Sequence, residues 1–155
     1  MLSRILELFH DATQDEEQPS TEERVRLATA AILVECARAD ETFSHSEKEH
    51  VIETLRQRFQ LPQEEAEELL RESKQSLRES SDLWTFTNAL NEALSPDEKT
   101  EILEEAWRII FLDGALHAHE DYLIHKLARL LNLTHPELIE AKMKVLEEVR
   151  NSPEP

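Results

Sequence analysis

The sequence predicts an all-α protein, a helical bundle of about seven to eight helices. Leu, Ala, Glu and Arg dominate its 155 residues, whereas it contains one Gly and one Tyr, and this usage favours helices over sheets. Helix-start patterns recur along the chain, and the apolar residues after each start have helical spacing. The length is typical of one domain with a substantial core.

Four capping-box patterns mark expected helix starts. Each places a hydroxyl three residues before a Glu, so that the hydroxyl accepts a backbone N–H and the Glu reaches back to the first residue. In the third pattern Pro96 also stands at the first helical position, where its missing N–H costs nothing. The patterns are Ser20 to Glu23, Ser44 to Glu47, Ser95 to Glu98 and Thr134 to Glu137.

The apolar runs that follow give the helices in order. The run over 25–39 is apolar on all its faces, which is typical of a central, buried helix. The run over 51–59 forms a single stripe, and the run over 66–77 predicts a more solvated helix. Further amphipathic runs cover 83–94, 102–110, 123–131 and 138–149. We expect the aromatic residues Trp84, Phe86 and Trp107 in the core, because their neighbours are apolar at helical spacing.

The first residues predict a separate amphipathic helix. Leu2, Ile5, Leu6 and Phe9 form one helical stripe, which can dock on the domain or on a partner. The polar, acidic segment 11–18 is typical of a mobile linker. We therefore divide the chain into an N-terminal amphipathic helix and acidic linker (1–19), a helical domain (20–151) and a disordered tail (152–155).

The net charge of -17 excludes several classes of partner. It repels nucleic acid and anionic membrane surfaces, and no stretch approaches the ~18 apolar residues of a membrane span. Membrane association is at most peripheral. The first residues are too short and too charged for a signal peptide. The one cysteine, Cys36, excludes an internal disulfide and predicts a reducing, cytoplasmic location; it lies in an apolar run, as a small buried side chain.

One phrase occurs twice in the chain. Asp40 ends an apolar run and is followed seven residues later by Glu47, and Asp113 is followed in the same way by Glu120. Both copies have an apolar residue three positions after the Asp, and the flanking apolar positions also match. This duplication predicts two related helix-turn-helix halves packed about a pseudo-twofold axis.

The doubled phrase also points to a metal site. Asp40 and Asp113 fall at helix C-termini, which prefer positive charge. A bound cation offsets that cost, and so does a hydrogen-bond donor from the following turn. Glu47 and Glu120 are likewise explained as helix-start residues. Carboxylate oxygens favour Ca²⁺, Mg²⁺ or Mn²⁺, and the residues alone leave the metal site and the structural turn open.

Two neighbouring residues extend the candidate set. Glu35 lies inside an apolar run, where it either pairs with Arg38 or reaches towards the first turn. His119 stands beside Glu120 and, with His117, is a softer ligand that favours Zn²⁺, which we expect less than the three hard cations. The candidate metal ligands are Asp40, Glu47, Asp113, Glu120, Glu35 and His119.

The sequence lacks the signatures of common enzymes. It has no Gly-rich phosphate loop, no Gly-x-Ser-x-Gly and no plausible Cys–His pairing, so we predict a protein that is not an enzyme. Two functions fit the remaining features. One is a divalent-metal-binding protein, and the other is a protein-interaction module whose acidic face or N-terminal helix docks an unidentified partner.

The residues at the two turns resemble a known family. Residues 33–40 (Leu-Val-Glu-Cys-Ala-Arg-Ala-Asp) with Glu47, and residues 107–114 (Trp-Arg-Ile-Ile-Phe-Leu-Asp-Gly) with Glu120, are similar to the repeated Ala-Asp-Gly-x-[apolar]-x-x-x-Glu phrase of the TerB tellurite-resistance family. The likeness covers about residues 22–141, with Glu41 in place of the usual first Gly. The resemblance implies two related helical halves, a metal site at the acidic turns and a link to tellurite resistance and stress response. Related domains beside J-domains imply a co-chaperone-like adaptor as the alternative.

Overall fold

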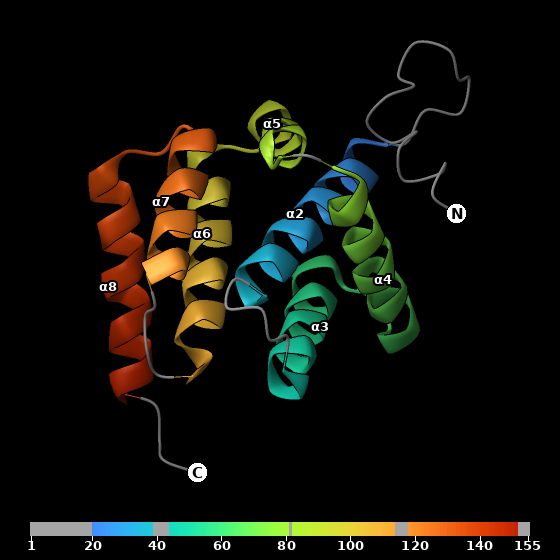
Figure 1. Cartoon of the computed structure of the whole chain (residues 1–155), viewed down its shortest axis with the longest axis horizontal. Coiled ribbons are helices and arrows are strands. Elements are labelled where there is room, and N and C mark those ends of the chain that lie inside the picture. The colour runs from blue at the N-terminus through green and yellow to red at the C-terminus, as the bar shows by residue number, and fades with distance from the viewer. Residues whose placement is uncertain (1–19, 39–43, 81, 114–117, 152–155) are drawn as a thin grey trace.

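The computed structural model describes residues 20–38, 44–80, 82–113 and 118–151. Within these ranges the chain forms seven α-helices, one 3-10 turn and no strand, which confirms the predicted all-α class (Figure 1). The elements are α2 (Thr21–Ala37), α3 (His45–Phe59), α4 (Gln63–Glu79), α5 (Trp84–Ala93), α6 (Pro96–Ile110), η1 (Phe111–Asp113), α7 (Ala118–Leu130) and α8 (His135–Asn151). The expected N-terminal helix, linker and tail lie outside the described residues, and the domain division and the pseudo-twofold axis stay predictions.

All four predicted capping boxes are formed. At the start of α2, the Ser20 Oγ accepts the Glu23 N–H at 3.0 Å, and the Ser20 N–H donates to Glu23 Oε1 at 3.0 Å. Each such cap satisfies backbone donors that have no helical partner and contributes about 1 kcal/mol. The same reciprocal pairs join Ser44 with Glu47, Ser95 with Glu98 and Thr134 with Glu137.

Helix α2 is surrounded by the rest of the domain. Every residue from Leu27 to Ala37 except Glu35 is buried, and α3, α4, α5, α6 and α7 all contact this helix. Figure 1 shows α2 lying between the α3–α4 pair and the group of α6, α7 and α8. The apolar character on all faces therefore predicted its central position correctly.

Two of the three aromatic predictions are confirmed and one is wrong. Phe86 and Trp107 are fully buried, and the Trp107 Nε1–H donates to the Leu138 carbonyl at 3.3 Å. Trp84, in contrast, is 58% exposed. It is the first residue of α5, and the inward positions of this helix fall on Leu83, Phe86 and Leu90, so helical spacing directs Trp84 outwards.

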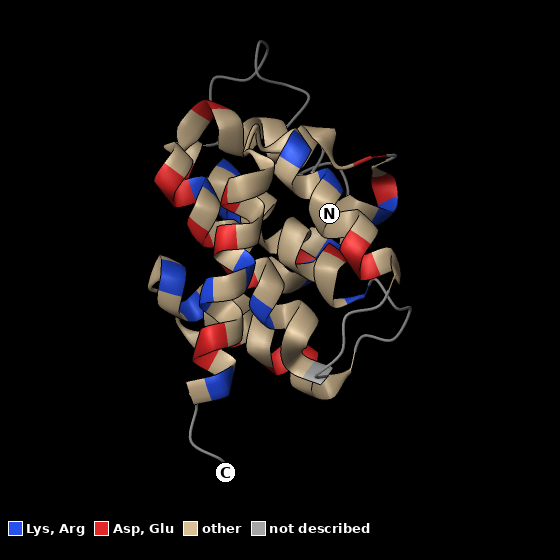
Figure 2. Ribbon diagram, turned by 90° about the vertical axis from the view of Figure 1, so that its left-hand side faces the viewer, with Lys and Arg blue, Asp and Glu red and all other residues tan. Residues whose placement is uncertain are grey.

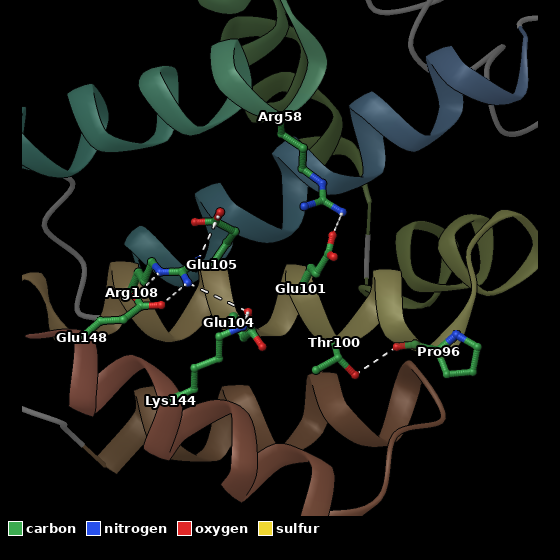
Figure 3. Close-up of polar contacts among 9 residues, drawn as sticks. All are labelled: Arg58, Pro96, Thr100, Glu101, Glu104, Glu105, Arg108, Lys144 and Glu148. Carbon is green, nitrogen blue, oxygen red and sulfur yellow. Dashed lines mark hydrogen bonds and ion pairs between the residues drawn. The ribbon is translucent and has the colours of Figure 1, made fainter.

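Ion pairs tie α8 to α6 across their outer edge (Figure 3). Arg108 donates two hydrogen bonds to Glu148, at 2.9 and 2.8 Å, and also pairs with Glu105 at 3.2 Å. Lys144 pairs with the buried Glu104 at 3.3 Å. Acidic and basic residues are interspersed on the side that carries α8 (Figure 2), so part of the negative charge is neutralised locally.

A buried lysine fastens the end of α7 to the junction of α5 and α6. The Lys99 Nζ donates to Asn91 Oδ1 at 3.0 Å and to the Leu131 carbonyl at 2.8 Å. Asn91 in turn donates its Nδ2–H to the Leu130 carbonyl at 2.9 Å. The last carbonyls of a helix have no partner within it, so this pair of side chains satisfies them.

We expect Lys99→Met to lower the free energy of unfolding by about 1–3 kcal/mol, because it leaves a buried carbonyl and an amide oxygen without their donor. Urea unfolding at neutral pH measures the loss. Lys48→Met, at an exposed position on α3, is the matched control and should change stability by less than ~0.5 kcal/mol. Equal losses in the two variants would contradict the role of the buried ammonium.

The ion pair of α8 predicts a dependence of stability on pH. The hydrogen bonds from Arg108 hold the pKa of Glu148 below its ordinary value. A carboxyl with a depressed folded-state pKa stabilises the fold above its unfolded-state pKa, and that contribution disappears as pH falls through the folded-state pKa. We therefore expect Glu148→Gln to lower the melting temperature at neutral pH and to match the wild type at about pH 2.

The neighbouring Glu147→Gln removes the same charge from an exposed position on α8. It should leave the melting temperature nearly unchanged at neutral pH. A difference between wild type and Glu148→Gln that is the same at both pH values would rule out the ion pair as its cause.

Candidate functional site

The structure describes most of the six candidate ligands. Asp40 lies outside the described residues, and Asp113 is placed only as the last residue of η1. The described side chains are those of Glu35 in α2, Glu47 in α3, and His119 and Glu120 in α7.

Two of the candidate carboxylates lie near the buried thiol of Cys36, at the C-terminal end of α2. Glu35 lies in its last turn, and Glu120 lies in the first turn of α7, where it is only 2% exposed. Cys36 is fully buried beside them: burial raises the pKa of its thiol, and the charges of Glu35 and Glu120 raise it further. The charge of Glu120 acts on the Cys36 thiol, and α2 and α7 contact each other. The start of α7 therefore lies near the end of α2.

Acidic and basic side chains both lie near this end of α2. The last turn of α2 contains no basic residue, and the C-terminus of a helix carries a partial negative charge of its own. Arg38 caps the helix, however. Burial lowers the pKa of Lys74, and the positive charges of Lys48, Arg78 and Arg38 lower it further. Glu35 forms the predicted pair with Arg38, with an Nε to Oε1 distance of 3.7 Å, and both side chains are partly exposed. An exposed pair of this kind contributes little, so it offsets the local charge only in part.

Glu47 has a structural role in the capping box of α3. Its Oε1 accepts the Ser44 N–H at 2.9 Å, and its own N–H donates to the Ser44 Oγ at 3.1 Å. The side chain is buried. The predicted helix-start function is therefore confirmed, and a metal ion at this turn would have to use the other oxygen, Oε2.

An open cleft of about 400 Å³ lies beside the end of α2. It brings Glu35 together with His119, two candidate ligands that are 84 positions apart in the numbering of the chain. Sequence reasoning missed this cleft because one wall comes from the segment between α4 and α5, which carries no repeat signal. Among the residues that line it are Glu35, Arg38, Asp82, Leu83, His119 and Tyr122.

The described side chains do not complete a metal site by themselves. Within the part of the chain that the structure covers, no three His, Cys, Asp or Glu residues are grouped so that they could hold an ion. Glu35, Glu120 and His119 therefore need further ligands, and the two turns at 39–43 and 113–117 are adjacent to them in sequence. None of the described helices has the length and apolar character that crossing a membrane requires.

The buried thiol predicts low reactivity. Only the thiolate is a good nucleophile, and the raised pKa of Cys36 together with its burial keeps it protonated and inaccessible. We expect alkylation of Cys36 in the native protein to be slower by about 100-fold or more than in the unfolded chain, because it requires local opening. Mass spectrometry after timed treatment measures this, with the same reaction in denaturant as control. Equal rates in the two conditions would show that the thiol is accessible.

Comparison with known proteins identifies the family. A family model described as tellurite resistance protein TerB matches residues 26–143, a range that contains both turns and all six candidate ligands. Neither the curated proteins nor the solved structures gave a match. Since the family model covers well over half of a chain whose fold is all-helical, the protein belongs to the TerB family.

Proposed function

We propose that this TerB-family protein is a non-enzymatic, divalent-cation-binding domain linked to tellurite resistance and stress response. The cation binds at the C-terminal end of α2, with ligands from the two acidic turns. The observation that carries the proposal is that Glu35, in the last turn of α2, and Glu120, in the first turn of α7, lie on two helices that contact each other.

Electrostatics supports a cation at this place. Two carboxylates at the same end of a helix repel each other, and the partial negative charge of the α2 C-terminus adds to this cost. Glu120 is also almost completely buried, so water screens its charge poorly. A divalent ion turns this repulsion into attraction and makes the folded state more stable.

The chemistry of the ligands favours hard cations. Carboxylate oxygens are preferred by Ca²⁺, Mg²⁺ and Mn²⁺, and Asp40 and Asp113 supply the additional oxygens that a tight site needs. Glu47 contributes through Oε2, because its Oε1 caps α3. His119, on the wall of the cleft, would favour Zn²⁺, a less favoured ion because the other donors are oxygens.

We also propose that the protein is not an enzyme. The protonated, buried Cys36 cannot act as a nucleophile, and no other motif in the sequence supplies one. A single, inert cysteine also fits a reducing cytoplasmic setting.

A protein-interaction module is the second candidate function. It is favoured by the exposed aromatic residues Trp84 and Tyr122, which are 58% and 64% exposed, because exposed aromatic side chains are common in binding surfaces. In this alternative the carboxylates at the turns are structural.

We expect Ca²⁺, Mn²⁺ or Mg²⁺ to raise the melting temperature, since a ligand at 100 times its Kd stabilises the native state by about 2.7 kcal/mol. Asp40→Asn combined with Asp113→Asn should abolish this rise, because both turns lose an oxygen ligand. Differential scanning calorimetry with and without each ion measures the effect.

The matched control is Glu64→Gln combined with Glu147→Gln, which removes the same two charges from exposed helical positions. This variant should keep the full metal-dependent rise. No rise in the wild type, or an equal rise in both double variants, would contradict the proposed site.

A further inference from the structure

An exposed aromatic edge borders the cleft at the end of α2. Tyr122 lines the cleft directly. Trp84 follows the cleft residue Leu83, and its backbone N–H donates to Asp82 Oδ1, also of the cleft, at 2.8 Å. Leu83 and Leu123, which also line the cleft, are buried. Exposed aromatic rings beside apolar side chains form a surface that an amphipathic helix can cover.

We propose that the N-terminal segment of the same chain, residues 1–10, docks on this cleft and covers Trp84 and Tyr122. The segment lies outside the described residues. Its sequence places Leu2, Ile5, Leu6 and Phe9 at positions i, i+3, i+4 and i+7, which is one apolar face of a helix. This apolar face matches the leucine side chains of the cleft, Leu77, Leu83 and Leu123, which lie among polar and charged lining residues.

The chain is long enough for this docking. Helix α2 has 17 residues and is about 25 Å long, and the cleft residues Glu35 and Arg38 lie at its far end. The nine residues 11–19 span up to about 30 Å when extended, so the segment can reach every part of the cleft. Figure 1 also shows that α5 and the end of α4 lie toward the same end of the molecule as the start of α2.

Charge permits the contact as well. Residues 1–10 contain one Arg and one Glu, Arg4 and Glu7, so their side chains carry no net charge, whereas the whole chain carries -17. The segment is thus not repelled by the acidic domain, and the cleft offers Asp82 to Arg4 and Lys126 to Glu7. The acidic residues 11–17 form the solvated tether. The cleft shares Glu35 and His119 with the proposed cation site, so docking is tested without added metal.

Two spectroscopic probes report on the cleft in the full chain. Tyr122 is the only tyrosine, so 3-fluorotyrosine gives one ¹⁹F resonance at this site. Trp107 is fully buried, and acrylamide quenching of indole fluorescence therefore reports mainly on Trp84. The test variant is Leu6→Glu with Phe9→Glu, and the matched control, Ser3→Glu with His10→Glu, adds the same two charges at polar positions.

We expect the test variant to shift the ¹⁹F resonance and to raise the quenching constant about twofold, because a short flexible tether gives effective concentrations of only ~mM and incomplete docking. The control variant should behave as the wild type. Circular dichroism and melting curves check that the helical domain is intact in all three proteins.

Three results would overturn the proposal. The first is identical ¹⁹F and quenching data in all three proteins, which would leave the cleft uncovered in the isolated chain. The second is an equal ¹⁹F shift and an equal rise in the quenching constant in both variants, which would exclude docking through the apolar face. The third is loss of the docked signals on dilution, which would show that a second copy covers the cleft.

Discussion

The burial of α2 on all sides is the constraint on which the rest of the structure depends. Its residues from Leu27 to Ala37 are buried, apart from Glu35. Small residues such as Ala28, Ala30 and Ala31 allow neighbouring helices to approach closely. A helix enclosed in this way can place polar side chains in contact with solvent only near its ends. The position of the candidate site at the end of α2 therefore follows from the packing of the core.

Corresponding positions in the two copies of the doubled phrase carry opposite charges. Arg108 stands 73 residues after Glu35, the same offset that separates Asp113 from Asp40. Arg108 ties α6 to α8 through its bidentate bond to Glu148, which neutralises charge at that edge. Glu35, in contrast, adds a carboxylate to the end of α2, and its ion-pair partner Arg38 is partly exposed. We propose the cation at this end of α2.

Local patterns in the sequence predicted local structure well. The capping boxes and the buried α2 depend on residues within one or two turns of each other, and so does the pair of Glu35 with Arg38. Trp84 was misplaced because a shift of one position at a helix start turns a side chain from the core to solvent. The cleft and the Lys99 contact join segments far apart in the chain, and no periodicity reveals such contacts. The metal ligands at the turns stay a prediction.

The most direct test of a cation at the end of α2 is paramagnetic broadening of backbone amide NMR signals by substoichiometric Mn²⁺. We expect selective loss of the signals of Glu35, Cys36 and Glu120, which lie in the last turn of α2 and the first turn of α7. The signals of Ser95 and Leu133, which lie at other helix ends, should stay sharp, because the broadening falls steeply with distance from the ion. Weak broadening spread evenly over the acidic surface, or none at all, would contradict a defined site.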